Sequence, residues 1–183
     1  MYKPAKGLFR LTKFKDLEIK EEKPSVEVKE EDFYEPFAEW LMNEVEDATK
    51  AIPLGGNKFK DKWGTPDIIG IVKPGESDIV KMPIEVISAE IKTDTSNLIM
   101  ALGQACSYLL FSHKVYLSIP KQSPETDISR LDSLCQIFGI GLVLFDVSNA
   151  KDPKFEVRVR TAKHEPDFFY TNRYLKLIEN ELF

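Results

Sequence analysis

Two neighbouring stretches of the chain place acidic and basic side chains where they could act together. Asp67 lies at the head of an apolar run over 65–72, and Glu90 and Lys92 close a second run over 84–92. Because side chains alternate faces along a strand, Glu90 and Lys92 would point the same way. If the two runs pair as a hairpin, Asp67 meets both at one polar spot. Two carboxylates and an ammonium held together can bind a divalent metal and position a water, which suits phosphodiester hydrolysis.

A helix is predicted before these runs, because apolar residues recur at helical spacing over 33–49. Glu44 falls near the middle of its apolar face. An inward carboxylate without a partner costs several kcal/mol, on the order of what any unpaired buried charge costs. The sequence leaves two partners open for Glu44, a lysine in a salt bridge or a metal ion.

The elements after this helix define the fold class. Apolar and polar periodicity predicts strands at 66–72, 84–92, 115–119, 140–145 and 155–160, and helices at 97–112, 124–138 and 166–183. Strand–helix–strand units in the middle indicate parallel pairing there, with antiparallel strands around the hairpin. We therefore expect an α/β domain over 33–183, built on a mixed β-sheet flanked by helices on both faces. Residues 1–32 are predicted to form an arm or a small appendage.

Several surface features could contact a nucleic acid. Lys58, Lys60 and Lys62 alternate just before Trp63, so they could touch phosphates or could protect a solvated edge strand. Trp63 could insert toward DNA, or could anchor its loop, which is the commoner role. Lys121 is a further candidate contact. The net charge of -5 argues against a protein that coats DNA in general.

The sequence also bears on location. No apolar run approaches about 18 residues, so no membrane span is expected. The N-terminal residues lack the apolar stretch of a secretory signal. We therefore expect a cytoplasmic protein.

The order of the motifs resembles that of the PD-(D/E)XK phosphodiesterase superfamily, whose members share the restriction-endonuclease-like fold. Pro66-Asp67 is followed by Glu90-Ile91-Lys92, then by a predicted helix and a strand. In that helix, Gln104 and Tyr108 have the Gln-x-x-x-Tyr spacing that resembles the RecB-like branch, and residues four apart share a helix face. The resemblance covers roughly residues 33–121.

The resemblance implies a metal-dependent nuclease that cuts DNA and uses Mg²⁺ or Mn²⁺. Asp67 and Glu90 would supply carboxylate ligands, and the main-chain carbonyl of Ile91 would supply a third oxygen. Glu44 could contribute from the N-terminal helix, directly or through water. Hard cations such as Mg²⁺ prefer oxygen ligands of this kind.

The remaining roles concern the reacting groups. Lys92 would orient the attacking water or balance negative charge in the transition state. Beside two carboxylates this lysine should stay protonated, which argues against its acting as a free base. Gln104 could hold the attacking water or a phosphate oxygen, and Tyr108 could stack on a base, bond a phosphate or support the core.

Two other functions compete with this interpretation. One is a catalytically silent module that keeps the nuclease fold for DNA binding or protein assembly. The other is a hydrolase of small substrates, which is disfavoured because the chain lacks a glycine-rich phosphate loop and histidine ligands. The intact set of Asp67, Glu90 and Lys92 favours the nuclease. A homodimer is also possible, with the aromatic C-terminal helix as a contact.

Overall fold

A six-stranded mixed sheet forms the centre of the protein. The computed structural model describes residues 2–5, 8–10 and 28–183. In spatial order the strands are β3 (Lys50–Pro53), β4 (Ile68–Val72), β5 (Glu85–Ile91), β6 (Lys114–Pro120), β7 (Gly141–Phe145) and β8 (Glu156–Val159). Strands β5, β6 and β7 are parallel, and the other neighbours are antiparallel. The predicted mixed sheet, with parallel pairing in the middle, is confirmed.

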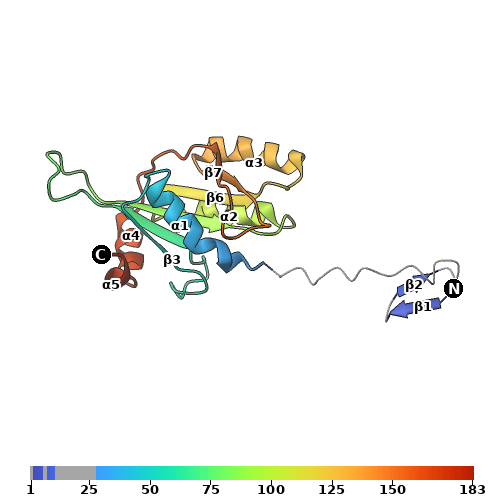
Figure 1. Cartoon of the computed structure of the whole chain (residues 1–183). Helices are drawn as coiled ribbons and strands as arrows, with labels where there is room; N and C mark the ends of the chain where they lie inside the picture. Colours follow the sequence, from blue (N-terminus) through green and yellow to red (C-terminus); the bar gives the residue numbers. More distant parts are fainter. Residues whose placement is uncertain (1, 6–7, 11–27) are drawn as a thin grey trace.

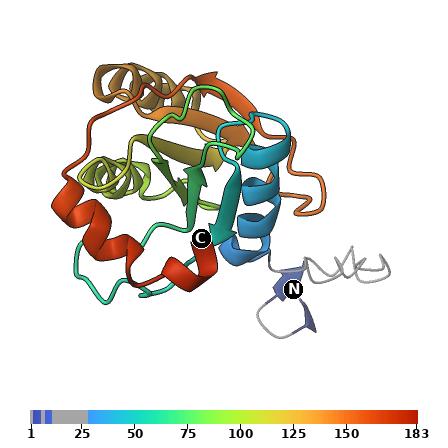
Figure 2. The same cartoon turned by 90° about the vertical axis from the view of Figure 1, so that its left-hand side faces the viewer.

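Helices cover both faces of this sheet, as the sequence indicated (Figure 2). One face carries α1 (Tyr34–Asn43), and the other carries α2 (Leu98–Tyr108), α3 (Glu125–Phe138), α4 (Phe168–Leu175) and α5 (Glu179–Leu182). The α1 face is rich in aromatic rings, such as Phe37 packed edge-on against Phe155. The opposite face is packed mainly by aliphatic residues, such as Leu102 and Leu117, together with a few rings such as Phe111. Two apolar layers therefore hold the sheet between them.

Strands β4 and β5 form an antiparallel hairpin with one closed end and one open end. Val72 pairs with Glu85 next to the connecting loop 73–84, and Ile68 pairs with Ala89 at the other end. The loop projects from one end of the sheet (Figure 1), and the strand pairing places Asp67 and Glu90 at the other end of the hairpin. β-Branched residues dominate β4, as suits a strand buried on both faces. The hairpin assumed from the sequence is confirmed.

Three helices are shorter than predicted, and one of them, α2, was expected over 97–112 but ends at Tyr108. The first was expected over 33–49, but α1 ends at Asn43, and Glu46 adopts a left-handed φ of 57° that stops the helix. The freed chain then forms β3, which had no assigned range. The last helix was expected over 166–183, but the chain breaks between α4 and α5.

The N-terminal region has a separate small sheet. Strands β1 (Tyr2–Ala5) and β2 (Leu8–Arg10) pair antiparallel with each other. A 3-10 turn, η2 (Glu30–Phe33), leads directly into α1, and Phe33 is fully buried in the α1 layer. The packed body therefore includes η2, most of which lies before the expected boundary at residue 33. In the part of the chain that the structure describes, no helix is long and apolar enough to cross a membrane.

Candidate active site

Asp67 is fixed at the open end of the β4–β5 hairpin. Its side chain is buried, with 7% exposure. Its main-chain N–H donates to the carbonyl of Ala89 over 3.0 Å, and its Oδ2 accepts the N–H of Ile91 over 2.7 Å. The aspartate is therefore bound to the last residues of β5 through both its backbone and its carboxylate.

Glu90 and Lys92 meet beside it, as strand alternation predicted. Glu90 is 2% exposed, and its Oε1 lies 2.9 Å from Nζ of Lys92. Its Oε2 accepts a hydrogen bond of 2.7 Å from the hydroxyl of Tyr108 on α2. One oxygen of Glu90 thus faces the lysine, and the other is held by the helix that covers this face.

Two residues that the sequence did not single out complete the cluster. The Tyr34 hydroxyl, in the first turn of α1, donates to Oδ1 of Asp67 over 2.6 Å. Glu30 in η2 lies 3.1 Å from Nζ of Lys92 and 3.4 Å from the Tyr34 hydroxyl. Nothing in the acidic run 30–32 distinguished Glu30 from its neighbours, because only the turn into α1 decides which acid points toward the sheet.

Burial controls the acidity of the two buried carboxyls. Desolvation and the nearby charge of Glu90 raise the pKa of Asp67 to about 7, against the hydrogen bonds from Tyr34 and Ile91, which lower it. Desolvation also raises the pKa of Glu90, although Lys92 and Tyr108 oppose the shift. Both carboxyls are therefore harder to ionise than in water, as expected for acids that share a dry site.

Lys92 remains a cation in this environment. Its burial acts to lower the pKa, but the carboxylates of Glu90, Glu30 and Asp67 outweigh that effect and raise it. This supports the expectation that the lysine is not a free base. Three acids lie around a single lysine, so acidic groups outnumber basic ones in this cluster.

The donor set fits a hard divalent cation. Asp67 and Glu90 offer only oxygen, and Mg²⁺ usually takes one or two carboxylates while keeping several waters. Among the described residues, no group of three or more His, Cys, Asp or Glu side chains is close enough to hold a metal. An ion would therefore depend on two carboxylates, the Ile91 carbonyl and water.

The structure contradicts the expectation for Glu44 and decides among the alternatives for Tyr108. Glu44 was expected to face inward as a possible metal ligand, but α1 ends one residue before it and its side chain is exposed. It lines a hollow with Lys114 and Tyr116, at the N-terminal end of β6, whereas the acid pair lies at the C-terminal end of the parallel neighbour β5. Tyr108 cannot stack on a base, because its ring is fully buried and its hydroxyl holds Glu90, so the alternative that it supports the core is confirmed.

The other predicted contacts lie on the surface. Gln104 is exposed on α2, one turn before Tyr108. The three lysines of the β3–β4 loop, Lys58, Lys60 and Lys62, are exposed on turns, so the alternative of an edge strand there is wrong. Lys58 pairs with Glu181 over 2.7 Å, and Lys121, just beyond β6, pairs with Glu156 over 3.1 Å.

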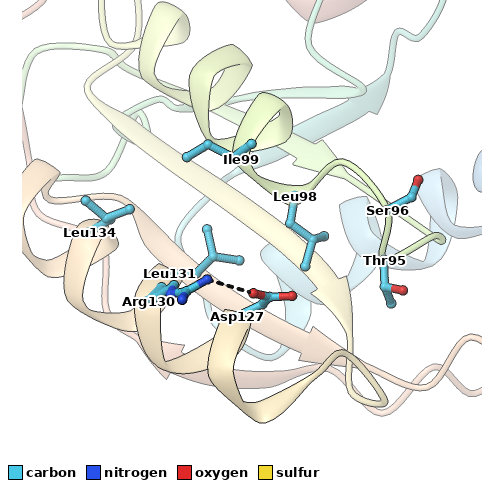
Figure 3. Close-up of a pocket in the computed structure, with 8 residues that line it drawn as sticks. All are labelled: Thr95, Ser96, Leu98, Ile99, Asp127, Arg130, Leu131 and Leu134. Carbon is cyan, nitrogen blue, oxygen red and sulfur yellow. Dashed lines mark ion pairs between the residues drawn. The ribbon is translucent and has the colours of Figure 1, made fainter.

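A hollow lies between α2 and α3, and its first lining residue, Thr95, follows Lys92 closely in the sequence (Figure 3). Thr95 and Ser96 line it, and Leu98, Ile99 and Leu134 give it an apolar wall. Its lining cation, Arg130, lies 3.6 Å from Asp127, so the charge is balanced locally. This hollow lacks a buried acid pair, and the candidate active site is the cluster around Asp67 and Glu90.

None of three comparisons, with models of protein families, with curated proteins and with solved structures, finds a match to this chain. The arrangement is therefore interpreted from its own chemistry. It combines two buried acids of raised pKa, one protonated lysine and two tyrosine hydroxyls. Such a cluster can bind a divalent cation and present a fixed positive charge to an anionic substrate.

Proposed function

We propose that this protein is a metal-dependent nuclease of the PD-(D/E)XK superfamily that hydrolyses DNA phosphodiester bonds. The observation that supports this most is the convergence of Asp67, Glu90 and Lys92 at the ends of two paired strands. Burying two carboxylates beside one lysine costs stability, because unpaired charge is expensive inside a protein. Strongly perturbed acids of this kind are typical of functional sites.

The metal would be held by oxygen ligands on β5 and at the head of β4. Asp67, Glu90 and the main-chain carbonyl of Ile91 would bind Mg²⁺ or Mn²⁺. When bound, such an ion stabilises charge on the phosphate and lowers the pKa of a coordinated water. Glu30 takes the place that the sequence assigned to Glu44, as the acid from the N-terminal segment, because its side chain contacts Lys92.

The other residues orient these groups and receive the substrate. Lys92 supplies an ammonium that balances negative charge on the phosphate in the transition state. Tyr34 and Tyr108 hold the two carboxylates in fixed directions through short hydrogen bonds. Gln104, exposed on α2, could hold the attacking water or a phosphate oxygen. The exposed lysines of the β3–β4 loop and Lys121 are candidate contacts for DNA phosphates.

A cleavage assay with matched variants tests the proposal. Supercoiled plasmid and single-stranded DNA are incubated with the protein in Mg²⁺ or Mn²⁺. Asp67→Asn should reduce cleavage at least about 100-fold, because a neutral amide is a poor ligand for a hard cation. Asp47→Asn is the control, since Asp47 binds Lys114 at the other end of the sheet. Equal cleavage by Asp67→Asn and the wild type would mean that the activity belongs to a contaminant.

A second candidate is a module of the same fold that holds DNA or assembles proteins without cutting. One observation favours it. Both oxygens of Asp67 and both oxygens of Glu90 already have partners within the protein. Absence of cleavage in every metal and with both substrates, by a folded protein, would support this module and contradict the nuclease.

A further inference from the structure

An aromatic hollow lies between the β3–β4 loop, α2 and α4. Trp63, Leu110, Tyr170 and Arg173 are among its lining residues. The indole of Trp63 is 65% exposed, an unusual state for the largest apolar side chain. This residue therefore contributes little to the core and is available to a ligand.

The loop that carries Trp63 is held in place by other residues. Oδ1 of Asp61 accepts the main-chain N–H of Trp63 over 3.1 Å, and Oδ2 accepts the Tyr174 hydroxyl over 2.8 Å. These hydrogen bonds lower the pKa of Asp61, first that from Trp63 and then that from Tyr174. Phe59 is buried and stacks on Tyr174, with ring centroids 4.7 Å apart. The anchor of the loop is Phe59, and the anchoring role considered for Trp63 is wrong.

The same loop is tied to the acid cluster. The carbonyl of Thr65 lies 3.2 Å from the Tyr108 hydroxyl, which also bonds Glu90. Between Trp63 and Asp67 lie only three residues. A nucleotide that binds at Trp63 would therefore belong to a DNA strand that also passes the candidate active site.

The charges around the hollow favour a polyanion. Lys60, Lys62 and Arg173 are exposed, and none of the three forms an ion pair within the described part of the chain. Asp61 also lines the hollow and attracts Arg173 and Lys62, so three cations stand against one carboxylate there. Exposed aromatic rings combined with unpaired cations are the typical equipment for single-stranded nucleic acid, whose bases stack on the rings while the backbone meets the charges. A duplex hides the faces of its bases and could not use Trp63 in this way.

We propose that this hollow binds an unpaired nucleobase stacked on Trp63, with Lys62 and Arg173 near the adjoining phosphates. The substrate class is then single-stranded or locally unpaired DNA. This inference rests on the proposed function, because it assumes that DNA lies along this side of the acid cluster.

Tryptophan fluorescence gives a direct test. The only other tryptophan, Trp40, is 6% exposed, so a stacked base should quench mainly Trp63. Oligothymidylate is titrated into the full chain in EDTA, which prevents cleavage. It should quench the emission and bind at least about 10-fold tighter than a duplex of equal length. Trp63→Ala should weaken binding about 10-fold, within the range of about 5- to 150-fold that base stacking supports, whereas Trp63→Phe should bind nearly as well as the wild type.

The outcomes separate this inference from the nuclease proposal. Unchanged fluorescence, together with plasmid cleavage that needs Asp67, would overturn the stacking site and leave the nuclease standing. Quenching that Trp63→Phe removes, without cleavage in any metal, would support the stacking site and overturn the nuclease. Equal affinity for single strand and duplex, or a dimer that Trp63→Ala dissociates without any quenching by DNA, would overturn the inference.

Discussion

Two clusters of an acid, a lysine and a tyrosine lie toward opposite ends of the sheet. At one end, Asp47 contacts Nζ of Lys114 over 2.7 Å and accepts the hydroxyl of Tyr116. At the other, Glu90 contacts Lys92 over 2.9 Å and accepts the hydroxyl of Tyr108. The residue types are the same, so residue type alone does not separate a structural cluster from a functional one.

Charge balance and burial do separate them. Asp47 and Lys114 form one pair, and each side chain is 21% exposed. Glu90 is 2% exposed, and Asp67 and Glu30 add two further acids around the same lysine. A balanced, partly exposed pair needs no explanation beyond packing, whereas buried excess acid is costly, and the proposed metal site would offset that cost.

The largest expected difference between the two clusters is catalytic. Lys92→Met should reduce DNA cleavage by about 100-fold or more, because it removes the fixed positive charge that faces the phosphate. Lys114→Met makes the same chemical change at the other cluster and should leave cleavage within about threefold of the wild type. Initial rates of plasmid nicking in Mg²⁺ measure both. Similar losses in the two variants would show that the comparison does not distinguish function.

The second largest difference between the two clusters is expected in metal binding. Mn²⁺ at about 100 times its dissociation constant should stabilise the wild type by about 2.7 kcal/mol, because only the folded state forms the site. Asp67→Asn should lose most of this stabilisation, and Asp47→Asn should keep it. Thermal unfolding with Mn²⁺ and after its removal by EDTA gives the shift. A stabilisation that survives Asp67→Asn would place the ion elsewhere.

A smaller effect, on the free energy of unfolding, is expected from a change of pH in the absence of metal. The pKa of Asp67 is about 7 in the folded protein and about 3.9 in an unfolded chain, so the folded state binds more protons between these values. Stability should therefore fall as pH rises from about 4 to 7, on the order of 1 kcal/mol per pH unit at the steepest.

The matched variants identify the source of this dependence. Asp67→Asn cannot ionise, so its unfolding free energy, from urea titrations between pH 5 and 8, should fall less with pH than that of the wild type. Asp47→Asn should follow the wild type. Parallel curves for the wild type and Asp67→Asn would refute the raised pKa.

Local patterns in the sequence were sufficient for most of the sheet. The shared direction of Glu90 and Lys92 follows from strand alternation, which depends only on neighbouring residues. The β4–β5 hairpin was assumed because the two strands follow each other along the chain. The parallel strands β5, β6 and β7 follow from the helices between them. These features could be predicted because each depends on a short stretch of chain.

Features set by a single backbone angle or by a distant contact could not be predicted. The end of α1 depends on the left-handed conformation at Glu46, a residue type that rarely adopts it. The prediction that Glu44 faces inward assumed that the helix continued past Asn43. Because this boundary was wrong, Glu44 was wrongly included among the candidate metal ligands. Glu30 and Tyr34 enter the cluster through contacts with residues more than 30 positions away, which no spacing rule reveals.

The β4–β5 hairpin has a consequence for how this chain tolerates changes in length. Extra residues in the loop 73–84, even a whole reporter domain, would extend the closed end and leave the paired acids undisturbed. One residue added or removed inside β5 would instead turn Glu90 toward the aromatic layer beneath α1. Relatives of this protein should therefore carry insertions in the loop 73–84 and keep the length of β5 constant.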